Sequence, residues 1–140
     1  TIELRAIARE AGSRTKIAVF SNDPNVDPKG ACVGSRGSRV RQIVNELKGE
    51  KLDVVEWRED KVRFIIEALG PADIELVDID EHTKSAKVTV KDNQLSLAIG
   101  KEGQNARLAA KLTGYKIDIE GLGDSPVVEE VQEESKQEEE

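Results

Sequence analysis

The sequence predicts an α+β protein made of two similar units and an acidic tail. One observation is an internal repeat, because the order strand, strand, helix, glycine loop, helix, strand occurs twice within 140 residues. Another is the glycine loop, which is Gly34-Ser35-Arg36-Gly37 in the first unit and Gly100-Lys101-Glu102-Gly103 in the second. The third is the glutamate-rich end of the chain, a composition typical of disorder. We expect a first unit at 1–59, a second at 60–120 and a disordered acidic tail at 121–140.

The first unit opens with two strand patterns joined by a turn. Apolar residues alternate with polar ones over 2–8, and a second apolar run over 16–20 is typical of the returning strand of a hairpin. Asp27 followed by Pro28 predicts the start of a short helix over 28–33. After the glycine loop, helical spacing over 40–47 ends at Gly49, and residues 51–57 form the third strand pattern.

The second unit repeats this order after an extra helix. Asp60 can cap a helix that Gly70-Pro71 ends. Strand patterns follow over 74–79 and 87–90, and after the second loop a helix runs to Gly114 before a strand over 116–119. The junction between the units is short, so we expect them to be held in a fixed relation.

The first unit begins directly with a strand, and the chain has no initiating Met. We therefore expect a fragment, or a processed form, of a longer protein whose upstream helix completes the first unit.

The net charge of −7 is unevenly distributed along the chain. Residues 121–140 hold eight acidic residues and one basic residue, so residues 1–120 carry 20 of each sign. Within this neutral part, residues 29–41 contain four cations and no carboxylate. Such a local excess, rather than the overall pI, decides whether a surface attracts phosphate.

Composition also indicates the cellular compartment in which we expect the protein. The single Cys32 cannot form an internal disulfide, which favours a reducing environment. No apolar run approaches the ~20 residues of a membrane span, and no signal peptide is visible. We expect a cytoplasmic monomer with no membrane partner.

The glycine loops are the candidate binding sites. A loop at the start of a helix presents backbone N–H groups where the helix dipole favours an anion, and glycine lets a sugar-phosphate backbone approach closely. Glu102 should weaken the second site unless its side chain points into solvent. The alternative is that each loop is only a turn and its cations form a solvated face. In the first unit the candidate residues are Lys29, Gly34, Ser35, Arg36, Gly37, Ser38, Arg39 and Arg41. In the second they are Gly100, Lys101, Glu102, Gly103, Gln104, Asn105, Arg107 and Lys111.

The order of elements around each loop resembles the KH domain of type II topology, whose GxxG loop clamps single-stranded nucleic acid. More narrowly, the chain resembles the tandem KH pair of the NusA family of bacterial transcription factors over about residues 1–120. The motifs that carry this resemblance are Ser21-Asn22-Asp23-Pro24, Gly30-Ala31-Cys32-Val33-Gly34, Gly37-Ser38-Arg39-Val40 and Asp92-Asn93-Gln94-Leu95-Ser96-Leu97-Ala98-Ile99-Gly100-Lys101-Glu102-Gly103-Gln104-Asn105.

The resemblance implies a three-stranded mixed sheet packed against helices in each unit. It implies binding of single-stranded, nascent RNA by a factor that modulates pausing, termination and antitermination, without catalysis. RNA polymerase and other transcription factors would be partners of the full-length protein. By analogy, apolar side chains would line a base-binding groove beside each loop: Val33, Val40 and Val54 in the first unit, and Ile99, Ala106 and Ile119 in the second.

Other chemistry finds little support. His82 is the only histidine, and with one cysteine besides, a zinc site is not expected. No G-x-x-x-x-G-K-[ST] run is present, and no catalytic constellation can be assembled. We expect no metal, no cofactor and no enzymatic activity. The rival hypothesis is a protein-interaction module whose glycine loops are structural turns.

Overall fold

A computed structural model describes residues 2–33 and 49–123 of the chain. The first glycine loop, the helix predicted over 40–47 and residues 124–140 of the predicted tail lie outside the described residues, whereas Gly121 still belongs to the last strand.

The first unit is a three-stranded sheet with a short helix. Strand β1 (Ile2–Glu10) pairs antiparallel with β2 (Arg14–Ser21), and β2 pairs parallel with β3 (Lys51–Glu56). Helix α1 (Pro28–Val33) has the predicted bounds. Its start follows from Asp27, whose carboxylate accepts a hydrogen bond of 3.1 Å from the backbone N–H of Lys29.

The second unit repeats this arrangement. Its sheet has the order β4-β5-β6, with an antiparallel pair followed by a parallel pair. The α+β class and the two mixed sheets are therefore confirmed. Its elements are α3 (Lys61–Ala68), β4 (Leu76–Asp80), β5 (Ser85–Val90), the 3-10 turn η1 (Asp92–Gln94), α4 (Leu95–Ile99), the 3-10 turn η2 (Lys101–Gly103), α5 (Gln104–Thr113) and β6 (Lys116–Gly121).

Local sequence accounts for most of these boundaries. Asp60 caps α3 by accepting from the N–H groups of Val62 and Arg63, as predicted. Gly114 ends α5 in the left-handed region at φ 80°. Strand β4 begins at Leu76, two residues later than its repeat pattern predicts, although the Glu75 N–H already bonds to the Thr89 carbonyl.

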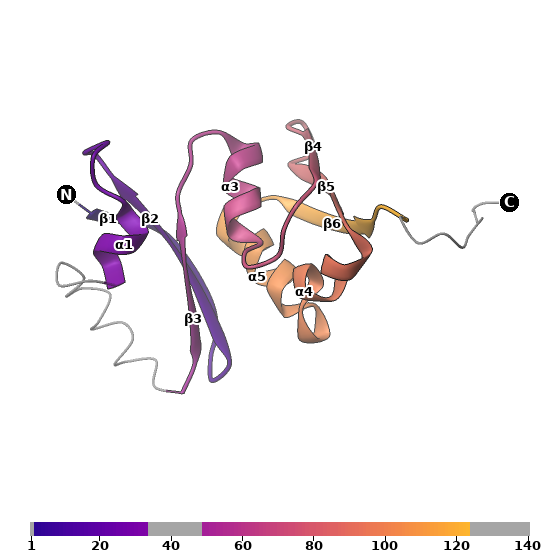
Figure 1. Ribbon diagram of the computed structural model, residues 1–140, viewed down its shortest axis with the longest axis horizontal. Coiled ribbons are helices and arrows are strands. Elements are labelled where there is room, and N and C mark those ends of the chain that lie inside the picture. The colour runs from indigo at the N-terminus through magenta and orange to yellow at the C-terminus, as the bar shows by residue number, and fades with distance from the viewer. Residues whose placement is uncertain (1, 34–48, 124–140) are drawn as a thin grey trace, which may run out of the picture.

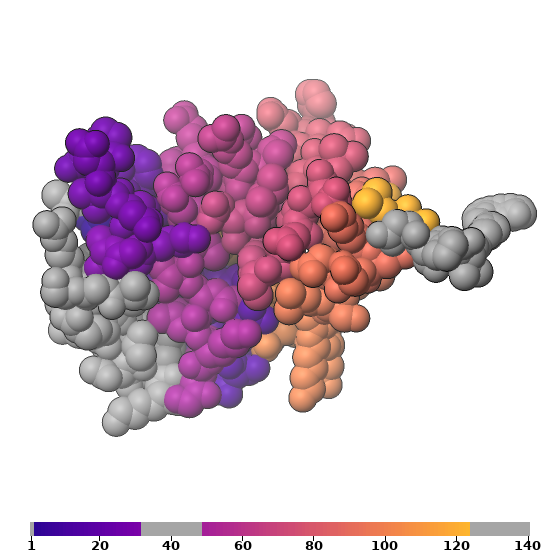
Figure 2. All heavy atoms as spheres, viewed as in Figure 1, coloured from indigo at the N-terminus to yellow at the C-terminus, as the bar shows by residue number. Residues whose placement is uncertain are grey.

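Helices α3 and α5 form a layer between the two sheets (Figure 1). Helix α5 contacts β1 and β2 of the first unit on one side and β6 of its own sheet on the other. One apolar cluster therefore includes residues of both units. On the face seen in Figure 2, α3 and β3, in magenta, occupy the middle of the molecule. Because burying each large aliphatic side chain contributes roughly 1.5–3 kcal/mol, this shared core holds the units together. Its buried members include Ala8, Ala18, Val55, Phe64, Ile65, Leu69, Leu108 and Ala109.

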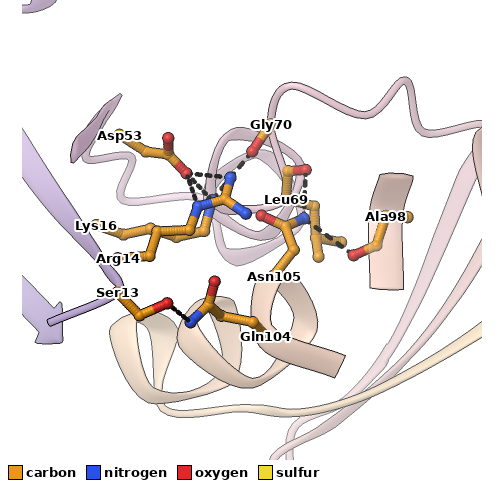
Figure 3. A network of polar contacts seen from close by, with 9 residues as sticks. All are labelled: Ser13, Arg14, Lys16, Asp53, Leu69, Gly70, Ala98, Gln104 and Asn105. Atoms are coloured by element: carbon orange, nitrogen blue, oxygen red, sulfur yellow. Dashed lines mark hydrogen bonds and ion pairs between the residues drawn. The ribbon is translucent and has the colours of Figure 1, made fainter. Parts of the chain in front are cut away.

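A polar cluster accompanies this core at the junction (Figure 3). The side chain of Lys16 is fully buried, and its Nζ donates to the carboxylate of Asp53 at 2.7 Å and to the carbonyl of Gly70 at 3.0 Å. Arg14 donates to the same carboxylate through Nε and Nη2. The contact to Gly70 ties β2 of the first unit to the end of α3, which agrees with the fixed relation that the short junction predicts.

The aromatic residues pack within the fold. Trp57 meets Phe20 edge to face, with ring centroids 5.5 Å apart, and Phe64 at 6.2 Å. The guanidinium of Arg5 lies 4.3 Å from the Phe20 centroid and 4.5 Å from that of Trp57. This cluster bridges β2, β3 and α3, so its role in packing is as predicted.

Candidate nucleic-acid interface

The second glycine loop joins two helices, as predicted. Helix α4 ends at Ile99, Gly100 follows at φ 82° and ψ 169°, and η2 leads into α5 at Gln104. The Gly103 N–H donates to the Gly100 carbonyl at 3.0 Å, which closes a tight turn. Glu102, at φ 56° and ψ 28°, adopts the left-handed conformation that non-glycine residues rarely take.

The two glycines of this loop have different surroundings. A Cβ on Gly100 would lie 2.6 Å from the backbone nitrogen of Asn105, so no side chain fits there. A Cβ on Gly103 would meet only the guanidinium of Arg107, at 3.6 Å. Gly100 is therefore required by the packing of the loop against α5, whereas Gly103 leaves the backbone of the loop uncovered by a side chain.

Asn105 does not belong to the solvent-facing surface. Its side chain is fully buried, and Nδ2 donates to the Leu69 carbonyl at 3.0 Å and to the Ala98 carbonyl at 2.9 Å (Figure 3). These carbonyls lie at the C-terminal ends of α3 and α4, where helices leave acceptors without intrahelical partners. The Asn105 side chain is thus not exposed for contact with RNA in this structure, where it holds the loop to the two helices.

Gln104 and Arg107 lie next to the loop but contact the first unit. Gln104 Nε2 donates to Ser13 Oγ at 2.7 Å and to Glu10 Oε1 at 3.0 Å. Arg107 donates to both carboxylate oxygens of Glu10, and its Nη1 donates to the Glu102 carbonyl at 2.9 Å. The side chain of Arg107 remains 45% exposed, so a phosphate can still approach it.

The remaining candidates of this loop are accessible. Lys101, Glu102 and Lys111 are all exposed, and α5 begins directly after the loop. We expected Glu102 to weaken the site unless its side chain points into solvent, and this side chain is exposed. An anion could bind here, because the loop combines an exposed cation, a glycine without a projecting side chain and the start of a helix.

Candidates of the first unit are described only in part. Lys29 is exposed on α1, with its Nζ 3.7 Å from a carboxylate oxygen of Glu67. Gly34, Ser35, Arg36, Gly37, Ser38, Arg39 and Arg41 lie outside the described residues.

The predicted apolar lining is partly accessible. Ile99, Ala106 and Ile119 are half-buried, as a groove floor requires. Val54 is half-buried as well and lines a cavity of about 500 Å³ between β3 and α3, with Lys29 and Lys51 among its walls. Nothing is described of the Val33 side chain or of Val40.

Sequence reasoning missed the residues of the first unit that reach this site. Glu10 and Ser13 belong to the β1–β2 hairpin, and only the packing of the units brings them to α5. One signal was present: Arg14 and Lys16 directly precede the apolar run of the second strand at alternate positions, and charged residues that face inward on a strand require partners.

Two further observations concern the described residues alone. No group of His, Cys, Asp and Glu side chains in residues 2–33 and 49–123 could hold a metal ion. None of the helices in these ranges is long and apolar enough to cross a membrane.

Comparison with known proteins places each unit. Residues 1–57 match the NusA-like first KH domain, and residues 61–126 match the NusA-like second KH domain. The transcription termination/antitermination protein NusA of Halalkalibacterium halodurans is 61% identical over 119 residues, which are 85% of this chain and 31% of that protein. The same protein of Bacillus subtilis is 58% identical over 125 residues, covering 89% of this chain and 34% of the relative. This chain thus spans about a third of the length of these relatives.

Among solved structures, the crystal structure of APE1850 is similar, with a TM-score of 0.54 and 26% identity. The match covers 76% of this chain and 78% of that one.

Proposed function

The chain belongs to the family of NusA-like tandem KH domains, and from this we propose that it binds single-stranded RNA within a transcription termination and antitermination factor. The RNA is nascent transcript, and binding influences pausing, termination and antitermination by RNA polymerase. Contact with the polymerase and with other transcription factors belongs to the full-length protein, which acts in the bacterial cytoplasm. The KH pair itself acts as a monomer, with the unit boundary at residues 59 and 60.

The observation that supports RNA binding is the form of the second loop. Gly100 lets the loop pack against α5, Gly103 leaves its backbone without a projecting side chain, Lys101 is exposed, and the ten-residue helix α5 starts immediately afterwards. A phosphate at this point gains the positive end of the helix dipole and a charge-assisted contact with Lys101. A base can then rest on the half-buried side chains of Ile99 and Ile119.

Each unit alone should bind weakly. No aromatic residue occurs in either loop, so stacking worth ~1–3 kcal/mol per base is missing there. Because the units are packed together rather than linked flexibly, binding at one site brings the next stretch of RNA close to the other.

The test replaces exposed loop side chains. Lys101→Asp with Glu102→Asp should weaken the binding of a fluorescently labelled, unstructured RNA roughly tenfold or more, because a phosphate then meets carboxylates only. A matched control is Lys84→Asp with Glu81→Asp in the β4–β5 turn, which makes the same charge change at the end of the second unit away from α4 (Figure 1). Ser35→Asp with Arg36→Asp tests the first loop in the same way.

Fluorescence anisotropy at several salt concentrations completes the experiment. Log affinity should fall as log salt rises, with a slope that reflects a few released counterions. Unchanged affinity in both loop variants, together with a flat salt response, would instead favour the rival hypothesis of a protein-interaction module.

A further inference from the structure

We propose that Glu10 is a positioning residue through which the first unit holds the RNA-binding loop of the second unit in shape. This inference rests on the proposed function, since it concerns the same loop. It assigns a role to a residue that lies about ninety positions before the loop and belongs to the other unit.

Hydrogen bonds link the carboxylate of Glu10 to the guanidinium of Arg107, and that guanidinium to the backbone of the loop. Glu10 accepts hydrogen bonds from Nε and Nη2 of Arg107, the latter at 2.9 Å. Nη1 of the same guanidinium donates to the carbonyl of Glu102 at 2.9 Å. All three nitrogens of Arg107 are thus engaged, and because the group is planar and rigid, fixing two of its nitrogens orients the third.

The loop has a specific need for this support. Glu102 carries a side chain and yet adopts the left-handed region at φ 56°. Such a conformation persists only where surrounding contacts hold it. The hydrogen bond from Arg107 to the Glu102 carbonyl acts on this residue directly, so the Glu10 carboxylate stabilises the loop without touching RNA.

A second contact acts on the start of α5. Gln104 is the first residue of that helix, and its side-chain amide bonds to Glu10 and to Ser13 of the same hairpin. The hairpin therefore holds both the middle of the loop, through Arg107, and its C-terminal end, through Gln104.

Positioning and simple electrostatics predict opposite results. Glu10 is a carboxylate beside a site that should attract phosphate, and it neutralises Arg107, which could itself contact RNA. If Glu10 only repelled or competed with RNA, its removal would tighten binding. If it positions the loop, its removal weakens binding although a negative charge has been taken away.

The experiment measures RNA affinity for Glu10→Ala and Glu10→Gln in the full chain. The side chains of Glu10 and Arg107 are 22% and 45% exposed, so we expect a loss of affinity of about two- to fivefold for Glu10→Ala, in line with exposed ion pairs. Glu10→Gln, which keeps one acceptor oxygen, should lose less. Glu81→Ala, which removes an exposed carboxylate from the β4–β5 turn, is the charge-matched control and should leave affinity unchanged or slightly raised.

A readout without RNA separates this inference from the proposed function. Hydrogen exchange of the Gly103 amide, which bonds to the Gly100 carbonyl, should be faster in Glu10→Ala. The amide of Gly114, at the other end of α5, reports any general loss of stability, so exchange at Gly103 should rise by a larger factor than exchange at Gly114. A larger increase at Gly103 than at Gly114 supports positioning even if the chain bound no RNA.

A mutant cycle tests the route through Arg107. In an Arg107→Ala background, Glu10→Ala should have a smaller effect on affinity than in the wild type, because the connection is already cut. Tighter binding by Glu10→Ala, or unchanged affinity and unchanged exchange at Gly103 while the Lys101 and Glu102 variant loses binding, would overturn the inference and leave the proposed function standing.

Discussion

At the scale of the residue, Asn105 illustrates how position decides chemistry. An asparagine just after a glycine loop is a natural candidate for a nucleic-acid contact, yet here its amide satisfies two helix-end carbonyls inside the protein. Within the described residues, Oδ1 of the same side chain has no hydrogen-bond partner. Its value to the fold lies in the two donated hydrogen bonds.

Replacement of Asn105 by Ala should therefore destabilise the protein rather than affect RNA selectively. The carbonyls of Leu69 and Ala98 each lose a donor, although Leu69 keeps the N–H of Ala72, and a small cavity remains, so we expect the free energy of unfolding to fall by about 2 kcal/mol or more. Urea unfolding measures this change. The control Asn93→Ala, at an exposed asparagine of the same unit, should stay within about 0.5 kcal/mol of the wild type. Equal stability of both variants would contradict the structural role.

At the scale of the element, the junction between α4 and α5 depends on backbone geometry more than on side chains. Gly100 combines a positive φ with close contact to the first turn of α5, whereas Gly114 has a positive φ with open space around it. The two positions also differ in backbone conformation: Gly114 is in the left-handed helical region at ψ 12°, whereas Gly100, at ψ 169°, is in a region that glycine almost alone adopts.

Comparison of Gly100→Ala with Gly114→Ala tests this distinction. Gly114→Ala should lower stability by about 1–2 kcal/mol, the cost of a left-handed alanine. Gly100→Ala should cost clearly more, because alanine is disfavoured at φ 82° and ψ 169° and because its Cβ meets the backbone nitrogen of Asn105, which cannot swing away as a side chain can. Thermal and urea unfolding of the two variants give the difference, and equal losses would contradict the additional cost at Gly100.

At the scale of the whole molecule, the two units share one core and a set of ion pairs. Hydrogen bonds from Arg107 and Gln104 lower the pKa of Glu10 from 4.5 to about 2. Those from Arg9, Gly12 and Thr15 lower the pKa of Glu50, whose side chain is 3% exposed, to about 2 as well. Between pH 4.5 and 2 each carboxyl binds fewer protons in the folded than in the unfolded protein, so folding loses stability there as pH falls.

Stability should accordingly be greatest above pH 4.5 with respect to these two groups and should decline as the pH falls toward 2. A double variant, Glu10→Gln with Glu50→Gln, should be less stable than the wild type at pH 7 but should show a shallower decline across that window. Urea unfolding at a series of pH values, followed by the fluorescence of the single Trp57, measures both slopes. Parallel pH profiles would mean that these carboxyls titrate alike in the folded and unfolded states.

Much of the architecture could be predicted because local sequence patterns specify it. Alternation marked β1 and a continuous apolar run marked β2. The Asp27 and Asp60 caps marked the starts of α1 and α3, and Gly114 marked the end of α5. Each of these signals acts between residues only a few positions apart, so the sequence contains it directly. The repeat then indicated two units with the same order of elements.

The candidate site likewise has features that local sequence predicts and features that depend on packing between the units. The sequence by itself determined the loop between Gly100 and Gly103, the exposed Lys101 and the helix that follows, because turn and helix chemistry are local. Only the tertiary structure decided that Asn105 turns inward, that Gln104 and Arg107 contact the β1–β2 hairpin, and that Lys16 spans the junction to Gly70. Those outcomes depend on which surfaces of the two units meet, and packing between segments 36 to 97 residues apart produces no local sequence pattern.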